Sequence, residues 1–278
     1  MTDTVHTEVV FSDMHNRKAV VRNLMEKIGL LKDDVRQPGF RTTQLGDRLS
    51  LGYGEQETDF YEWVDGLIDV QLVGNHEYPS VGPKAQTMMF SGYEERDIVA
   101  EQMLRRDFNH ARMSLDPDKW VAASNIGPWL IVHAGLTPAA QKELGAGQTA
   151  AEYAVILNEL WIDHVTNGTI EPIFLDTRQQ GNGIFWVRLP YLRAGYRDSH
   201  VPQIVGHTGY DANQKWAPPS LQNRDKNIWG LDTPGSCAAL VTTDNGENLT
   251  LVESDYYVRY DENRLQGNVY RVDTDELI

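Results

Sequence analysis

Polar residues that can bind metal ions follow five short strand-like runs of the chain. Most of these runs are rich in Val, Ile and Leu, which is typical of buried strands. Each is followed within a few residues by Asp, Asn or His, and these residues are Asp13, His15, Asp47, Asn75, His133 and His207. Carboxylate, amide and imidazole groups together suit divalent ions such as Mn, Fe, Ni or Zn. We therefore predict a site for two divalent ions.

The spacing of these residues suggests how they share the ions. Residues two apart in a strand point to the same face, so Asp13 and His15 can contact one ion as the strand opens into its loop. The carboxylate of Asp47 has two oxygens with free lone pairs, so it can bridge both ions. An open α/β sheet gathers such ligands beyond the carboxyl ends of its strands. The second ion would be completed by three further residues: Asn75, His133 and His207.

Five motifs, in this order, resemble those of the calcineurin-like metallophosphoesterases. The family order is D-x-H, G-D-x-V-D-R-G, G-N-H-E, H-G-G-L-S-P and G-H-T. The chain has Asp13-Met14-His15, Gly46-Asp47-Arg48-Leu49-Ser50-Leu51-Gly52, Gly74-Asn75-His76-Glu77, His133-Ala134-Gly135-Leu136-Thr137-Pro138 and Gly206-His207-Thr208. Together the five are a far stronger signal than any one of them alone. Within the family, the chain resembles bacterial and phage serine/threonine protein phosphatases and symmetrical diadenosine tetraphosphatase.

The resemblance runs from about Val9 to about Val241 and implies both a fold and a set of roles. The implied fold is a two-sheet α/β sandwich flanked by helices. One ion would be held by Asp13, His15 and Asp47, and the other by Asp47, Asn75, His133 and His207. A hydroxide that bridges the ions would attack phosphorus, and His76 would protonate the departing alkoxide. We expect two Mn ions, with Fe, Zn or Ni as alternatives.

The second motif departs from the family pattern at two positions. The Asp that orients the catalytic His falls at Ser50, and the Arg that clamps the phosphate falls at Leu51. A serine cannot stabilise an imidazolium as a carboxylate does, and loss of a bidentate Arg weakens phosphate positioning. The segment Trp186-Val187-Arg188 resembles one from which relatives supply another phosphate-contacting Arg. We therefore expect Arg188 to bind phosphate, with Arg48 as the second candidate.

Simpler roles are open for several of these residues. Arg188 could end a buried strand and reach solvent, Arg48 could make a surface ion pair, and Glu77 is expected to accept hydrogen bonds without acting in catalysis. The chain has 8 His. Four of them are expected to be surface or capping residues: His6, His110, His164 and His200.

Composition narrows the class of protein. The chain has 278 residues, of which 41% are hydrophobic, which is enough for one substantial core, so we expect a single domain over residues 1–278. The net charge of -15 argues against general nucleic-acid binding and against anionic membranes. Cys237 is the only cysteine, so no internal disulfide can form. Without a signal peptide or a long apolar run, the expected location is the cytoplasm.

The remaining segments give a coarse outline of alternating strands and helices. We expect helices at 16–30 and 93–113, and a short one entered from 52–63. The long segment 138–199 is expected to be a cap insertion that begins with helical sequence and turns aromatic. Its aromatic residues could stack a nucleobase, although packing within the protein is favoured. The end of the chain, 254–278, is expected to form an edge hairpin or a tail.

The expected function is metal-dependent hydrolysis of phosphate esters, by a phosphomonoesterase of the protein-phosphatase type. The substrate would be a phosphorylated small molecule, a nucleotide or a phosphoprotein. A dinucleoside polyphosphate hydrolase or a phosphodiesterase is the enzymatic alternative. A further alternative is a binding protein that keeps its metals but has lost turnover through the changes at Ser50 and Leu51.

Overall fold

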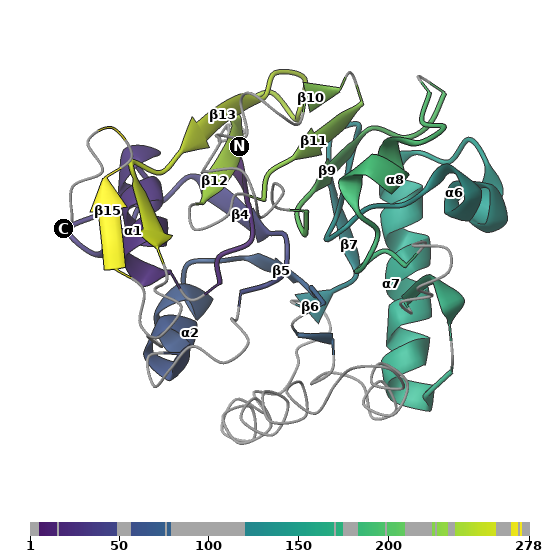
Figure 1. Cartoon of the computed structure of the whole chain (residues 1–278), viewed down its shortest axis with the longest axis horizontal. Helices are drawn as coiled ribbons and strands as arrows, with labels where there is room; N and C mark the ends of the chain where they lie inside the picture. The colour runs from purple at the N-terminus through teal and green to yellow at the C-terminus, as the bar shows by residue number, and fades with distance from the viewer. Residues whose placement is uncertain are drawn as a thin grey trace, which may run out of the picture.

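The computed structural model shows two β-sheets packed face to face, with helices on their outer sides (Figure 1). It describes residues 6–15, 17–48, 57–75, 77–78, 120–169, 171–174, 183–197, 199–208, 224–225, 227–232, 237–259, 268–271 and 273. The two-sheet α/β sandwich expected from the motifs is therefore confirmed.

The first sheet has six strands in the order β13-β12-β1-β4-β5-β6. Strands β1, β4, β5 and β6 run parallel to one another. Strand β12 is antiparallel to β1, and β13 is antiparallel to β12. Because the parallel strands all end at one edge of the sheet, the residues that follow them meet there. The strands are β1 (Thr7–Phe11), β4 (Phe40–Gln44), β5 (Val70–Leu72), β6 (Trp120–Val121), β12 (Ala238–Thr242) and β13 (Thr250–Glu253).

The second sheet has five strands in the order β10-β11-β9-β8-β7. Its central strands β11, β9 and β8 are parallel, and the outer strands are antiparallel to their neighbours. The strands are β7 (Ala123–Ile126), β8 (Trp129–Val132), β9 (Gln203–Val205), β10 (Arg224–Asp225) and β11 (Ile228–Gly230). All five strands expected before the candidate ligands are thus present: β1, β4, β5, β8 and β9.

An apolar layer between the sheets holds them together. Ile131 and Ile204 from the second sheet meet Val10, Leu72 and Leu240 from the first, and all of these are buried. Burial of such aliphatic side chains contributes about 1.5–3 kcal/mol each. The packed layer fixes the two sheets relative to one another, and with them the strand ends that carry the candidate ligands.

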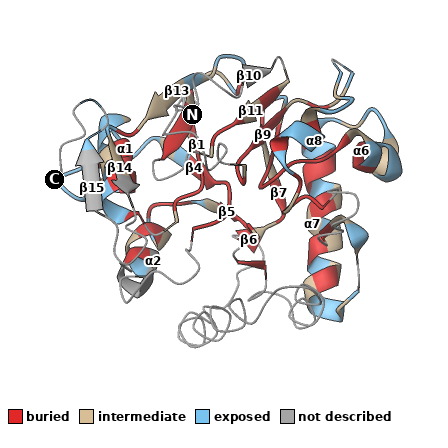
Figure 2. Cartoon of the chain, viewed as in Figure 1, coloured by how far each residue is buried: buried red, intermediate tan, exposed pale blue. Residues whose placement is uncertain are grey.

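Helices cover the outer face of each sheet. On the first sheet, α1 (Lys18–Lys27) and α2 (Glu57–Asp65) enclose one buried cluster. On the second, α6 (Pro138–Gly145), α7 (Ala150–Asn167), the 3-10 turn η1 (Pro172–Phe174) and α8 (Leu189–Arg193) enclose another. Figure 2 shows the face of α7 that is buried on the sheet and the face that is exposed.

The boundaries of α7 follow from capping residues at both ends. Thr149 and Glu152 form a capping box, in which each side chain bonds the backbone N–H of the other. The helix stops at Gly168, whose φ of 67° is in the left-handed region that glycine adopts easily. This long, well-capped helix gives the second sheet a rigid outer support.

The described part of 138–199 is a helical layer on the second sheet. Trp161, Phe174 and Phe185 lie in the buried cluster with strand residues such as Leu130, so the packing role favoured for the aromatic residues is confirmed there. Tyr191, in contrast, is 67% exposed. Residues 175–182 of this segment lie outside the described residues, as does the helix expected at 93–113.

Two small antiparallel pairs complete the fold. β2 (Leu31–Lys32) pairs with β3 (Val35–Arg36), and β14 (Tyr256–Arg259) pairs with β15 (Asn268–Arg271). The second pair lies within 254–278, and residues 260–267 between its two strands lie outside the described residues. In the described parts of the chain, no helix has both the length and the apolar character needed to cross a bilayer. The cytoplasmic location stays a prediction.

Candidate metal centre

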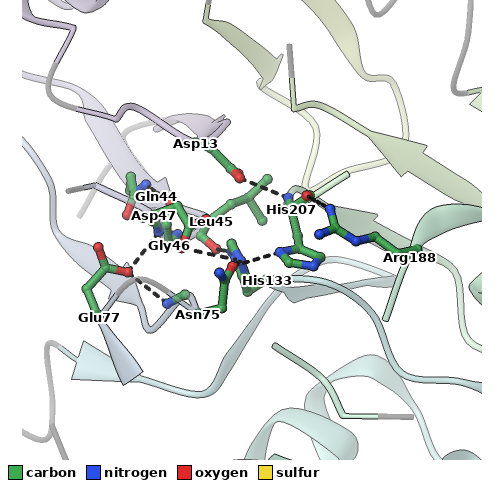
Figure 3. Close-up of polar contacts among 11 residues, drawn as sticks. Asp13, Gln44, Leu45, Gly46, Asp47, Asn75, Glu77, His133, Arg188 and His207 are labelled. Atoms are coloured by element: carbon green, nitrogen blue, oxygen red, sulfur yellow. Dashed lines mark hydrogen bonds and ion pairs between the residues drawn. The ribbon is translucent and has the colours of Figure 1, made fainter. Parts of the chain in front are cut away.

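Two groups of potential metal ligands meet at the carboxyl ends of the central strands, and both include Asp47. The first group consists of Asp13, His15 and Asp47, and the second of Asp47, His133 and His207. Within each group, one ligand atom of every residue lies within 4.8 Å of the others. Figure 3 shows several of these side chains converging from both sheets. The structure thus brings together residues that are far apart in the sequence.

The first group is assembled by the backbone of the loops after β1 and β4. β1 ends at Phe11, so Asp13 and His15 lie in a loop and the expected strand alternation does not explain their convergence. Instead, the carbonyl of Asp47 accepts hydrogen bonds from the N–H groups of Met14 (3.1 Å) and His15 (2.9 Å). This pair of bonds brings the two loops, and their ligands, together.

The second group gathers around the side chain of Asn75. Its Oδ1 lies 3.0 Å from Nε2 of His133 and 2.7 Å from Nδ1 of His207. Nε2 of His133 is also 3.5 Å from Oδ1 of Asp47. The four side chains expected to hold the second ion are therefore neighbours in space.

His133 is held in a defined orientation by the backbone. Its Nδ1 lies 2.8 Å from the carbonyl oxygen of Leu45, so Nδ1 carries the proton and donates it. The other ring nitrogen, Nε2, faces the oxygens of Asn75 and Asp47. Metal-binding histidines are commonly oriented in this way by a carbonyl acceptor.

Three of the candidate ligands have an unusual backbone conformation. His15, Asp47 and His207 have φ angles of 44°, 52° and 63°, in the left-handed region. Residues other than glycine adopt this region at some energetic cost, and such residues cluster at functional sites. The sharp turn at each of these positions is what points the side chain into the centre.

Glycines let the loops approach closely enough to form the centre. A Cβ at Gly74 would lie 2.2 Å from Oδ1 of Asp47, and a Cβ at Gly206 would lie 2.0 Å from Oδ1 of Asp13. Neither position has room for a side chain. Steric crowding therefore explains why the motifs have glycine directly before Asn75 and before His207.

The electrostatics of the centre favour a bound cation. Burial raises the pKa of Asp13 well above its usual value, and the negative charges of Asp232 and Asp47 raise it further. Oδ1 of Asp13 is buried and accepts no hydrogen bond among the described residues, while Oδ2 accepts one from the N–H of His207 at 2.9 Å. Divalent cations would balance the negative charge of these carboxylates. The oxygen and nitrogen donors present fit Mn, Fe, Zn or Ni.

Asp232 is an acidic residue of this centre that sequence reasoning missed as a candidate. It lies two residues after β11, next to the strand that carries His207. Burial raises its pKa, Arg17 lowers it, and Asp47 raises it. Its segment resembles a family motif, but only the position of β11 beside β9 shows that the carboxylate is near the centre.

Glu77 has the structural role expected for it. Its buried carboxylate accepts hydrogen bonds from the N–H groups of Asp47 (2.8 Å) and Gly74 (2.9 Å). The expectation that this residue accepts hydrogen bonds is therefore confirmed. His76, Ser50 and Leu51 lie outside the described residues.

The two arginines considered for phosphate binding have different surroundings. Arg188 is exposed, and its guanidinium donates to the carbonyl of His207 at 3.2 Å, so it lies at the edge of the centre (Figure 3). Arg48 forms the expected ion pair, 3.5 Å from Oδ1 of Asp65, but its side chain is fully buried and not at the surface. Its guanidinium lies over the ring of Trp120, 5.2 Å from the centroid, which accounts for the burial.

The two-sheet sandwich with candidate ligands at these strand ends is the fold that the motifs imply, and solved structures with a similar fold confirm it. Among solved structures, the chain is similar to a cold-active protein-tyrosine phosphatase of the psychrophile Shewanella sp. The identity is 17% and the TM-score 0.58, over 90% of this chain and 80% of that chain. Another structure of a cold-active protein tyrosine phosphatase matches with 16% identity and a TM-score of 0.55, over 89% of this chain and 78% of that chain. No protein-family model and no curated protein sequence matches the chain.

Proposed function

We propose that the chain hydrolyses phosphate monoesters at a centre of two divalent ions that share Asp47. The observation that supports this proposal is that the two groups of potential ligands have this one carboxylate in common. Two-metal phosphoesterase sites hold their ions about 3.5–4 Å apart, and a shared carboxylate suits that spacing. We assign Asp13 and His15 to one ion and Asn75, His133 and His207 to the other.

The chemistry divides between the ions and the chain. Bound ions would activate a water molecule near neutral pH and would neutralise charge on the phosphoryl oxygens. The chain orients the ligands through the carbonyl of Leu45 on His133 and the carboxylate of Glu77 on the N–H of Asp47. Such supporting contacts commonly change metal affinity or activity by about 10–100-fold.

Arg188 is the residue we assign to phosphate binding. Its exposed guanidinium is bonded to the backbone of a candidate ligand, His207, so it can reach a phosphoryl group bound at the ions. Arg48 is the second choice, because its guanidinium is covered by protein. A departing alkoxide needs a proton, and His76 is the residue we assign to supply it, from its position in the third motif.

The proposed cofactor is Mn, with Fe, Zn or Ni as alternatives, because this ligand set accepts several ions. The proposed substrate is a phosphoprotein or a small phosphomonoester. The similar solved structures are of a cold-active protein tyrosine phosphatase, so phosphotyrosine peptides should be tested together with phosphoserine and phosphothreonine peptides. The net charge of -15 disfavours nucleic-acid backbones as general partners.

The test is an activity panel on the protein reconstituted with Mn²⁺. It compares p-nitrophenyl phosphate, its bis ester, the three phosphopeptides and diadenosine tetraphosphate. We expect the monoesters to be hydrolysed fastest. Faster hydrolysis of diadenosine tetraphosphate or of the bis ester would favour the alternative enzymes, and tight metal loading without any hydrolysis would favour the binding protein.

Matched variants connect the activity to the centre. We expect Asp47→Asn to lower kcat by at least about 100-fold, and His76→Ala to lower it by about 100-fold or more. Asp33→Asn is the control, because Asp33 is an exposed Asp whose φ of 51° matches that of Asp47. Full activity in Asp47→Asn would contradict the proposal.

A further inference from the structure

Tyr78 links the turn that carries Asn75 to helix α7. Its hydroxyl lies 3.0 Å from Nε2 of His164, which is 86 residues further along the chain. Both side chains are buried, with exposed fractions of 0% for Tyr78 and 5% for His164. His164 is therefore not at the surface, which was one of the two roles expected for it from the sequence.

The surroundings of the pair favour one direction for this hydrogen bond. Nδ1 of His164 lies 2.5 Å from the carbonyl oxygen of Thr169, just beyond the end of α7, and can only donate there. When the ring carries this one proton, Nε2 accepts from the hydroxyl of Tyr78. Burial raises the pKa of Tyr78 above its ordinary value, so the hydroxyl keeps its proton and can donate it.

Aromatic packing holds the ring of Tyr78 independently of its hydroxyl. The ring centroid lies 5.4 Å from that of Phe185 and 6.1 Å from that of Trp161. Both neighbours belong to the buried cluster between α7 and the second sheet. Removal of the hydroxyl alone should therefore leave the ring in place and break only the bond to His164.

The turn itself is short and tied at both ends. The N–H of Tyr78 donates to the carbonyl of Gly74 at 2.9 Å, and the carboxylate of Glu77 accepts from the N–H of Gly74 at 2.9 Å. Asn75 lies inside this closed turn, with its Oδ1 between the rings of His133 and His207. A shift of the turn would move Asn75 relative to both rings.

We infer that Tyr78 and His164 are positioning residues, through which α7 holds the Gly74–Tyr78 turn so that Asn75 is placed among the ligands of the second ion. The inference rests on the proposed metal centre. It assigns a role in the centre to a helix of the 138–199 segment that supplies none of the candidate ligands.

The test measures the binding of Mn²⁺ to the full chain by titration calorimetry, so its readout is independent of hydrolysis. We expect Tyr78→Phe to weaken binding of one ion about twofold to tenfold, the range that loss of one buried hydrogen bond produces. Tyr153→Phe is the matched control. Tyr153 is a buried tyrosine of α7 whose hydroxyl donates to the carbonyl of Gly145 in α6 at 2.9 Å, and not to His164. Equal affinities in Tyr78→Phe and the wild type, or equal losses in both variants, would overturn the inference.

A double variant tests the pairing directly. If the two residues act through one bond, Tyr78→Phe combined with His164→Leu weakens Mn²⁺ binding no more than the stronger of the single variants. Additive losses would overturn the inference, because they would mean that the residues act separately. Calorimetry separates this result from the proposed function: a chain that binds Mn²⁺ with this pattern but hydrolyses no phosphate ester overturns only the proposed function.

Discussion

The carboxylate of Glu77 accepts a hydrogen bond from the backbone N–H of Asp47, 2.8 Å away. It joins the loop after β5 to the loop after β4, at the residue that the two ligand groups share. The third motif therefore does more than supply ligands. It also fixes the backbone that presents Asp47.

The Glu77 contact can be tested by a change of one atom. Glu77→Gln keeps the shape of the side chain but removes its negative charge. The neutral amide then replaces the carboxylate that accepts hydrogen bonds from the N–H groups of Asp47 and Gly74. We expect the free energy of unfolding to fall by about 1.5–3 kcal/mol, as for other hydrogen bonds to charged groups. The measurement is urea denaturation in the presence of a chelator. The exposed Glu159→Gln on α7 should change stability by no more than about 0.5 kcal/mol, and an equal effect in both variants would remove the special role of Glu77.

Close approach at Gly74 predicts a steric effect. In Gly74→Ala the new Cβ would lie 2.2 Å from Oδ1 of Asp47 and 2.3 Å from its backbone nitrogen, so the loops must separate. We expect a loss of about 1–3 kcal/mol or more in stability, together with weaker Mn²⁺ binding. Gly66→Ala is the control, since a Cβ there meets nothing within 4 Å. Normal metal binding by a folded Gly74→Ala variant would show that the loops can separate freely.

Kinetic measurements can distinguish the role of Arg188 from that of the candidate metal ligands. Arg188→Ala should lower kcat/KM for phosphomonoesters about tenfold or more, roughly 1.4 kcal/mol of transition-state stabilisation. Its affinity for Mn²⁺ should stay the same, because Arg188 donates to the backbone of His207 and not to the ring. Arg41→Ala, an exposed arginine on β4, is the control. Unchanged kcat/KM would contradict the assignment of Arg188 to phosphate binding and would favour the alternative, in which its side chain only reaches solvent.

The turn between β12 and β13 predicts an acid-sensitive contribution to stability. Hydrogen bonds from Thr242 and Asn248 lower the pKa of Asp244 from 3.8 to about 2. A depressed pKa in the folded state stabilises the fold above the unfolded pKa, and this stability is lost as the pH falls toward the folded pKa. Between about pH 5 and about pH 2, the urea midpoint of the wild type should therefore fall more than that of Asp244→Asn. Glu247→Gln, in the same turn, is the matched control, and identical pH profiles in the wild type and Asp244→Asn would contradict the prediction.

The strand ends were predictable because their physical signals are local. Short strands such as β8 (Trp129–Val132) are mostly apolar, and the polar residue that follows, here His133, stands out against them. Parallel strands then place Asp47 and Asn75 at one edge of the first sheet. For this reason the order of the motifs was enough to predict which residues meet.

Contacts that depend on tertiary packing were not predictable in the same way. The burial of Arg48 depends on Asp65 and Trp120, and the bond from Tyr78 to His164 joins residues whose separation in the sequence carries no pattern. The left-handed conformation of Asp47 also has no local signal, because it arises from the hydrogen bonds that the neighbouring loops make with its backbone. The sequence therefore predicts which candidate ligands meet, but not the residues that orient them.

The most direct test of the central claim counts the ions bound by each variant. Titration with Mn²⁺ should give two ions per chain for the wild type, one for Asp13→Ala, one for His207→Ala, and none held tightly by Asp47→Ala, because only Asp47 belongs to both ligand groups. Two tightly bound ions in Asp47→Ala, or a wild type that never binds more than one, would contradict the account.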